Sequence, residues 1–167
     1  MTRYEKRLAE EGKRHEAVRR RHDAFIGEFE RLIEETIRPT MEDVGAALRR
    51  RGHDYQIATT QAYTDVDRRS RNTQVTMQVY PAGIEQSLFT STSTPYVAFV
   101  CDWLDTRIAV RQSVASPGSA SKLPAGADRS GQRAEYFLRQ VTAPVVEREI
   151  VDVLGGVFGR GRVLDGR

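Results

Sequence analysis

An unbroken heptad pattern at the N-terminus constrains this chain more than any other feature of its sequence. From Tyr4 onward, seam positions follow one another at alternating steps of four and three residues for more than four heptads. This is the spacing of a coiled-coil seam. The seam comprises Tyr4, Leu8, Glu11, His15, Val18, His22, Phe25, Phe29, Leu32 and Thr36. The sequence therefore predicts one long helix over residues 3 to 37.

The two halves of this seam differ in composition. The first half is highly charged and carries Glu11 and two histidines on the seam, whereas three isoleucines widen the apolar stripe of the second half. A wide stripe suits packing on a domain, and a narrow one suits a single partner helix. We expect residues 24 to 37 to dock on the globular part and residues 3 to 23 to project by about 30 Å. A helix this long and polar is rarely stable alone, so we expect it to have a partner.

A proline and a glycine are expected to interrupt and to end the remainder of the helical region. Pro39 is expected to kink or restart the helix, because the residue before a proline, here Arg38, is pushed away from the α region. A second helical stretch follows, with acidic residues in its first turn, arginines in its last turn and Gly52 as its stop. Residues 1–53 are thus predicted to form a kinked helical segment that projects and dimerises.

From Asp54 the apolar pattern changes to the period of two that is typical of β-strands. The short spacings between strands favour antiparallel hairpins over parallel crossovers. Strands are predicted at residues 54–63, 73–80, 95–103 and 107–115. Residues 134–140 are either a fifth strand, which we favour, or the start of a helix. The polar segment 64–72 is expected to be a turn.

The C-terminal part combines a long loop with a helix. Residues 116–132 are rich in Gly, Ser, Ala and Pro, which predicts a flexible loop. Thr142 and Pro144 open a final helix. The apolar face of that helix is Val146, Ile150, Val153, Leu154 and Val157. Residues 54–167 should therefore form one globular unit.

Together these elements predict an α+β fold. The expected architecture is an antiparallel meander of four to five strands, with a long kinked N-terminal helix and a C-terminal helix packed on it.

Composition bounds the environment and the partners. The formal net charge is only +3, and the sequence contains no apolar run near the ~20 residues that a membrane span needs. We also expect no secretory signal, because the first residues lack an apolar stretch. The single cysteine, Cys101, has no second cysteine with which to form an internal disulfide. The cytoplasm is the expected compartment.

Residues that could carry chemistry do not converge in the sequence. His15-Glu16 begins like the zinc motif H-E-x-x-H, but Arg19 stands where the second histidine is required. His15 and His22 lie two turns apart, about 10 Å along a helix, which is too far to share one ion. Cys101 is expected to be a buried hydrophobe. We therefore predict no catalytic, metal or cofactor site and favour a non-enzymatic protein, without excluding an enzyme.

Arginine clusters offer a second interpretation. The clusters are Arg19, Arg20 and Arg21, then Arg49, Arg50 and Arg51, then Arg68, Arg69 and Arg71. They are either solvated helix and loop surfaces or contacts to a nucleic-acid backbone.

The predicted sheet has one unusual face. Its less apolar positions carry uncharged polar and aromatic side chains, namely Thr60, Gln61, Tyr63, Gln74, Thr76, Gln78 and Tyr80. Such a face is either a recognition surface or a surface half-covered by the N-terminal helix of the same subunit or of its mate. The sequence leaves both alternatives open.

The pattern as a whole favours a protein-interaction module that forms a homodimer through its N-terminal helix and meets an unknown partner. The self-association seam is predicted to include Val18, His22, Phe25, Phe29 and Leu32. The first alternative is a nucleic-acid-associated protein that uses the arginine clusters. The second is a small-molecule-binding or enzymatic pocket between the sheet and the C-terminal helix, lined by Phe99, Trp103, Tyr136 and Phe137.

Overall fold

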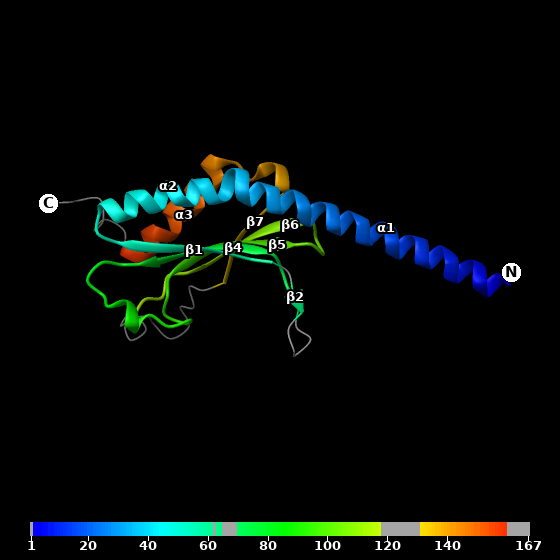
Figure 1. Cartoon of the computed structure of the whole chain (residues 1–167), viewed down its shortest axis with the longest axis horizontal. Helices are drawn as coiled ribbons and strands as arrows, with labels where there is room; N and C mark the ends of the chain where they lie inside the picture. Colours follow the sequence, from blue (N-terminus) through cyan, green and yellow to red (C-terminus); the bar gives the residue numbers. More distant parts are fainter. Residues whose placement is uncertain (1, 62, 65–69, 118–130, 160–167) are drawn as a thin grey trace.

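A five-stranded antiparallel sheet, covered by helices on one face, forms the body of the molecule (Figure 1). The computed structural model describes residues 2–61, 63–64, 70–117 and 131–159. The first helix extends far beyond the sheet, and its N-terminus is the most remote point from the body (Figure 1). The predicted α+β fold class is confirmed.

The N-terminal helical region runs without a break from Arg3 to Arg50. It consists of α1 (Arg3–Leu32), the π-helical η1 (Ile33–Ile37) and α2 (Arg38–Arg50). Arg38 keeps helical dihedral angles, φ −59° and ψ −48°, so the expectation that it would leave the α region is wrong. Its N–H donates to the carbonyl of Ile33, five residues back. The wider π turn makes room for Pro39, and the helix bends near this segment (Figure 1).

Gly52 ends α2, as the sequence predicts. Its φ of +86° is readily adopted only by glycine. The N–H of Gly52 donates to the carbonyl of Arg49 at 3.0 Å, and that of His53 donates to the carbonyl of Leu48 at 3.1 Å. These two bonds define a Schellman motif, which satisfies carbonyls at the helix end and turns the chain into the sheet.

The sheet is a meander in which the strands follow the order β1-β4-β5-β6-β7. Its strands are β1 (Asp54–Thr60), β4 (Gln74–Tyr80), β5 (Tyr96–Asp102), β6 (Arg107–Ser113) and β7 (Gly131–Tyr136). The fifth strand is confirmed, but it begins at Gly131, inside the segment that was expected to be a loop. The rest of that expected loop, residues 118–130, lies outside the described residues.

Short elements complete the described chain. β1 ends at Thr60, three residues before the predicted end of that strand. A small hairpin follows, in which β2 (Tyr63–Thr64) pairs with β3 (Ser70–Arg71) at the borders of the predicted polar turn. Two 3₁₀ turns, η2 (Gln86–Leu88) and η3 (Leu138–Gln140), lie after β4 and β7.

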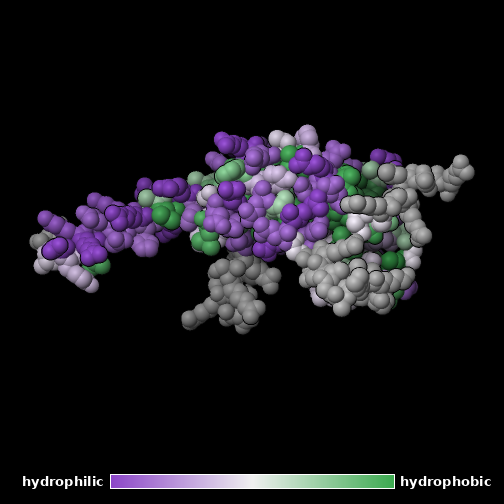
Figure 2. All heavy atoms as spheres, turned by 180° about the vertical axis from the view of Figure 1, so that it is seen from behind, coloured by the Kyte–Doolittle hydropathy of each residue, from purple (hydrophilic) through white to green (hydrophobic). Residues whose placement is uncertain are grey.

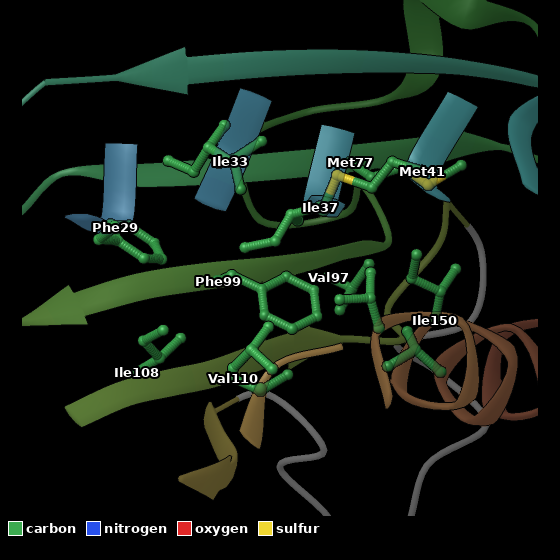
Figure 3. Close-up of a cluster of buried hydrophobic side chains, with 14 of the residues drawn as sticks. Phe29, Ile33, Ile37, Met41, Met77, Val97, Phe99, Ile108, Val110 and Ile150 are labelled. Atoms are coloured by element: carbon green, nitrogen blue, oxygen red, sulfur yellow. The ribbon is translucent and has the colours of Figure 1, made fainter. Parts of the chain in front are cut away.

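The core lies between the sheet and the helices (Figure 3). The helical region contributes fully buried side chains at regular steps of four, namely Phe29, Ile33, Ile37 and Met41. Four residues of an α-helix turn through about 400°, so such a series drifts around the helix, and the wider π turn reduces that drift. These side chains point toward Met77, Val97 and Phe99 of the central strands (Figure 3).

The C-terminal helix α3 (Ala143–Phe158) packs on the same face of the sheet and against α2. Thr142 takes the predicted N-cap position, although its side chain makes no capping hydrogen bond. The predicted apolar face is confirmed, because Val146, Ile150 and Val153 are buried and Leu154 and Val157 pack against the core. Within the described residues, no helix combines the length and the apolar composition that crossing a membrane requires.

Candidate functional site

The N-terminal part of α1 projects from the body as a solvated helix. We call residues 3–21 the projecting arm, and every one of them is exposed (Figure 1). Figure 2 shows its surface as mostly hydrophilic with a few small hydrophobic patches. Three large apolar side chains on the heptad seam are exposed to water, with Tyr4 at 73%, Leu8 at 58% and Val18 at 46% exposure.

Local interactions support the exposed arm. A capping box joins Thr2 and Glu5, in which the N–H of Glu5 donates to the Thr2 hydroxyl and the Thr2 N–H donates to the Glu5 carboxylate. Further along, Arg20 pairs with Glu16 at 2.9 Å. Exposed pairs of this kind contribute only about 0.3–0.5 kcal/mol each. The arm on its own is therefore a marginal helix.

The seam meets the body at His22. Its ring packs edge-on against Trp103, with ring centroids 4.8 Å apart. Phe25 and Leu32 are half-buried against the core, and Phe29 is fully buried in it. Of the five predicted seam residues, only Val18 is therefore well exposed, and Phe29 is held by its own sheet.

The arm carries more than the whole net charge of the chain. Residues 3–21 contain eight basic and four acidic side chains, a net charge of +4, whereas the complete chain is at +3. The basic residues Arg7, Arg14, Arg19 and Arg21 flank the seam positions in the sequence register. The surface around the exposed apolar residues is thus basic.

The predicted arginine clusters lie far apart. Arg19, Arg20 and Arg21 are on the arm, and Arg49, Arg50 and Arg51 are at the other end of the helical region, about 45 Å away at 1.5 Å per residue. The Arg49 guanidinium pairs with Asp54 at 3.0 Å and lies over the Tyr55 ring at 4.5 Å. Arg71 lies in β3, and Arg68 and Arg69 lie outside the described residues. The two helical clusters do not form one basic surface.

The uncharged polar face of the sheet points away from the helices. Val75, Met77 and Val79 of β4 face the core, so Gln74, Thr76 and Gln78 face the other side. The alternative in which the N-terminal helix of the same subunit covers this face is therefore wrong. Near the β1 edge, a hollow of about 380 Å³ is lined by Asp54, Tyr55, Gln56, Tyr80, Gln86, Phe89 and Thr94. The hydroxyl of Tyr80, one of these lining residues, donates to Oε1 of Gln78 at 3.2 Å.

The side chains expected to line a ligand pocket have different surroundings. Phe99 is fully buried in the core, and Trp103 packs on His22. Tyr136 donates its hydroxyl to Glu149, whereas Phe137 is exposed with the Arg107 guanidinium 3.8 Å from its ring centroid. A groove of about 890 Å³ does lie between the sheet and α3, but different residues line it, namely Gln112, Val114, Arg133, Val151, Asp152, Gly155, Gly156 and Gly159.

Sequence reasoning missed a buried carboxylate on α3. Glu149 is buried, its Oε2 accepts from Nε of Arg133 at 2.6 Å, and its Oε1 accepts from the Tyr136 hydroxyl. Arg133 also donates to Asp152 at 2.7 Å. Burial, followed by the hydrogen bond to Glu149, raises the pKa of Tyr136. This arrangement anchors β7 to α3, and its signal in the sequence is a charge next to Ile150 on an otherwise apolar face.

The predicted chemistry of Cys101 follows from its position. Its side chain is buried in the core, on the same face of β5 as Phe99. Burial, followed by the carboxylates of Asp102 and Glu30, raises the pKa of the Cys101 thiol to about 12. A protonated, buried thiol is a poor nucleophile. Among the described residues, no group of three or more His, Cys, Asp and Glu side chains could hold a metal ion.

His53 has a structural environment. Its Nδ1 accepts from the N–H of Ala82 at 2.9 Å, and its ring stacks at a tilt on Phe158 with centroids 4.4 Å apart. Burial, followed by the nearby charge of Arg51, lowers the pKa of His53. It therefore ties the end of α2 to the turn after β4 and to the end of α3.

Comparison with protein families, with curated proteins and with solved structures gave no match for this chain.

Proposed function

We propose that this protein is a non-enzymatic interaction module that self-associates through its projecting arm. The observation that carries the proposal is the exposure of Tyr4, Leu8 and Val18 on one heptad seam of the projecting arm, whose residues are all exposed. Pairing the arms would remove these side chains from water and would stabilise a helix that is marginal alone.

The conditions for association follow from the composition of the seam. Only two of its arm positions, Leu8 and Val18, are aliphatic, and Glu11 and His15 occupy the positions between them. Polar seam residues fix register at a cost in stability. The homodimer should therefore be weak and dependent on concentration.

Placing charge on the seam tests the proposal. The variant that combines Leu8→Arg and Val18→Arg should associate at least about tenfold more weakly than the unaltered protein, a change of ~1.4 kcal/mol, by sedimentation velocity. The matched control combines Ala9→Arg and Ala17→Arg at two exposed positions off the seam, which adds the same two charges and should leave association unchanged. Equal association of all three proteins would contradict the proposal.

A nucleic-acid backbone is the second candidate partner, and the net charge of +4 on the arm favours it. Contacts would come from Arg19, Arg20 and Arg21. Fluorescence anisotropy with a labelled random duplex at low salt would then show binding that reversing these three charges abolishes. Reversing Arg49, Arg50 and Arg51 is the matched control, and no binding at low salt would end this alternative.

The cytoplasm remains the proposed compartment, because the thiol of Cys101 is buried and unpaired in the core, as suits a reducing environment.

A further inference from the structure

The position of the sheet restricts how two arms can pair, if the proposed self-association is correct. From Phe25 onward, the seam side of α1 packs on the body of its own subunit. A parallel partner helix on the same side of the arm would continue past its own His22 into the space that this sheet occupies. A partner arm that runs the opposite way ends where the sheet begins.

We infer that the arms of two copies pair antiparallel, with the tip of each arm lying at the base of the other. Leu8 then faces the partner's Val18, and Tyr4 faces the partner's His22. Each seam is covered along its whole length, by the partner's arm up to His22 and by its own sheet from Phe25 onward.

The length of the arm fixes the register. Moving the partner by one heptad toward the body would push its tip into Trp103 and the sheet that covers Phe29. Moving it by one heptad the other way would leave Val18 uncovered. Only the register that places Leu8 opposite the partner's Val18 buries both aliphatic residues without a collision.

The charged layer on the seam favours the same arrangement. In the antiparallel register, Glu11 lies opposite the partner's His15, whereas in a parallel register it would lie opposite the partner's Glu11. Arginines meet at the edge of the seam in both orientations, Arg14 beside the partner's Arg14 in the antiparallel pair and beside the partner's Arg19 in the parallel one. The seam layer therefore decides, because two carboxylates facing each other destabilise a helix pair.

Disulfide cross-linking in full-length protein tests the orientation. Leu8 and Val18 are exposed, so Leu8→Cys and Val18→Cys should leave the fold intact, and Cys101 is buried. A disulfide needs Cα atoms within about 7 Å. In the antiparallel register position 8 meets the partner's position 18, whereas the two copies of position 18 lie about 15 Å apart.

The two variants are therefore equilibrated in a glutathione redox buffer, separately and as a mixture in which one carries a size tag. We expect a mixed disulfide in the combined sample at about tenfold the yield of either variant alone, in line with the distance limit for this bond. Sedimentation of the unaltered protein in the same buffer distinguishes a wrong orientation of the arms from a failure of the protein to self-associate. The unaltered protein could sediment as a dimer while the dominant disulfide joins two copies of Val18→Cys, or while no cross-link forms. Either result would overturn the antiparallel register and leave self-association standing. Monomers in sedimentation would overturn both.

Discussion

The imidazole of His22 packs edge-on against the indole of Trp103, with ring centroids 4.8 Å apart and ring planes at 66°. Along the chain, this is where the solvated arm ends and the packed part of the helix begins, because residues 3–21 are all exposed. The contact joins α1 to the turn between β5 and β6. It therefore fixes the direction in which the arm leaves the body.

Removing the indole should loosen this junction. Trp103→Ala is expected to lower the free energy of unfolding by about 2 kcal/mol, less than the 3–5 kcal/mol of a fully buried aromatic residue, because Trp103 is only half-buried. Leu104→Ala, at an exposed position next to it, is the control and should change stability by less than about 0.5 kcal/mol. Equal losses in denaturant titrations would show that the indole has no special role.

Gly45 allows α2 to approach β1 closely. A Cβ atom at this position would lie 2.3 Å from the ring of Tyr55, and that ring is also held beneath the Arg49 guanidinium. Gly45→Ala should therefore destabilise the fold by about 1–3 kcal/mol through overpacking. Gly27→Ala has open space around its Cβ and should instead stabilise the helix by about 0.5–1 kcal/mol. Opposite signs in thermal denaturation are the expected result, and stabilisation by both would contradict the packing.

The hydrogen bonds of Glu149 should make it the most sensitive carboxylate of α3. Glu149→Gln removes the charge that faces Arg133 at 2.6 Å and should cost about 3 kcal/mol of stability. Glu147→Gln, on the exposed side of the same helix, should be nearly neutral. Urea titrations of the two variants measure the difference. A loss below about 0.5 kcal/mol for Glu149→Gln would mean that the bonds to Arg133 and Tyr136 do not anchor β7.

Cys101 should react with thiol reagents only when the fold opens. Burial raises the pKa of its thiol from the ordinary 9.0 to about 12, so the folded state keeps a proton that the unfolded state loses. The associated stability is present below pH 9 and is lost as pH rises toward 12, at up to about 1.4 kcal/mol per pH unit. Cys101→Ala should show a shallower alkaline loss in denaturant titrations. Rapid labelling of native protein at pH 8 would contradict a buried thiol.

The sequence predicted the elements of this fold well where one pattern repeats over many residues. The heptad series predicted the long helix, and the alternation of apolar residues predicted the antiparallel meander. Periodicity alone did not indicate which seam residues the body covers, because the exposed Val18 and the half-buried Leu32 occupy the same heptad position. That difference depends on where the sheet ends, and only the tertiary structure shows it.

Two local rules were overridden by tertiary packing. Arg38 precedes a proline and was expected to leave the α region, but the π turn keeps it helical while Ile33 and Ile37 stay in the core. Glu149 receives its hydrogen bonds from residues 13 and 16 positions earlier in the chain, on a strand that no local pattern connects to α3. Neither the helical conformation of Arg38 nor the partners of Glu149 could be predicted from the spacing of residues close together in the sequence.

Molar mass by light scattering across a wide concentration range is the most direct test of arm pairing. The unaltered protein, with a chain mass of 18.9 kDa, should rise from that value in dilute solution toward about twice it at high concentration. The variant that combines Leu8→Arg and Val18→Arg should stay near the monomer mass. A mass that remains at 18.9 kDa for the unaltered protein at every concentration would contradict the account.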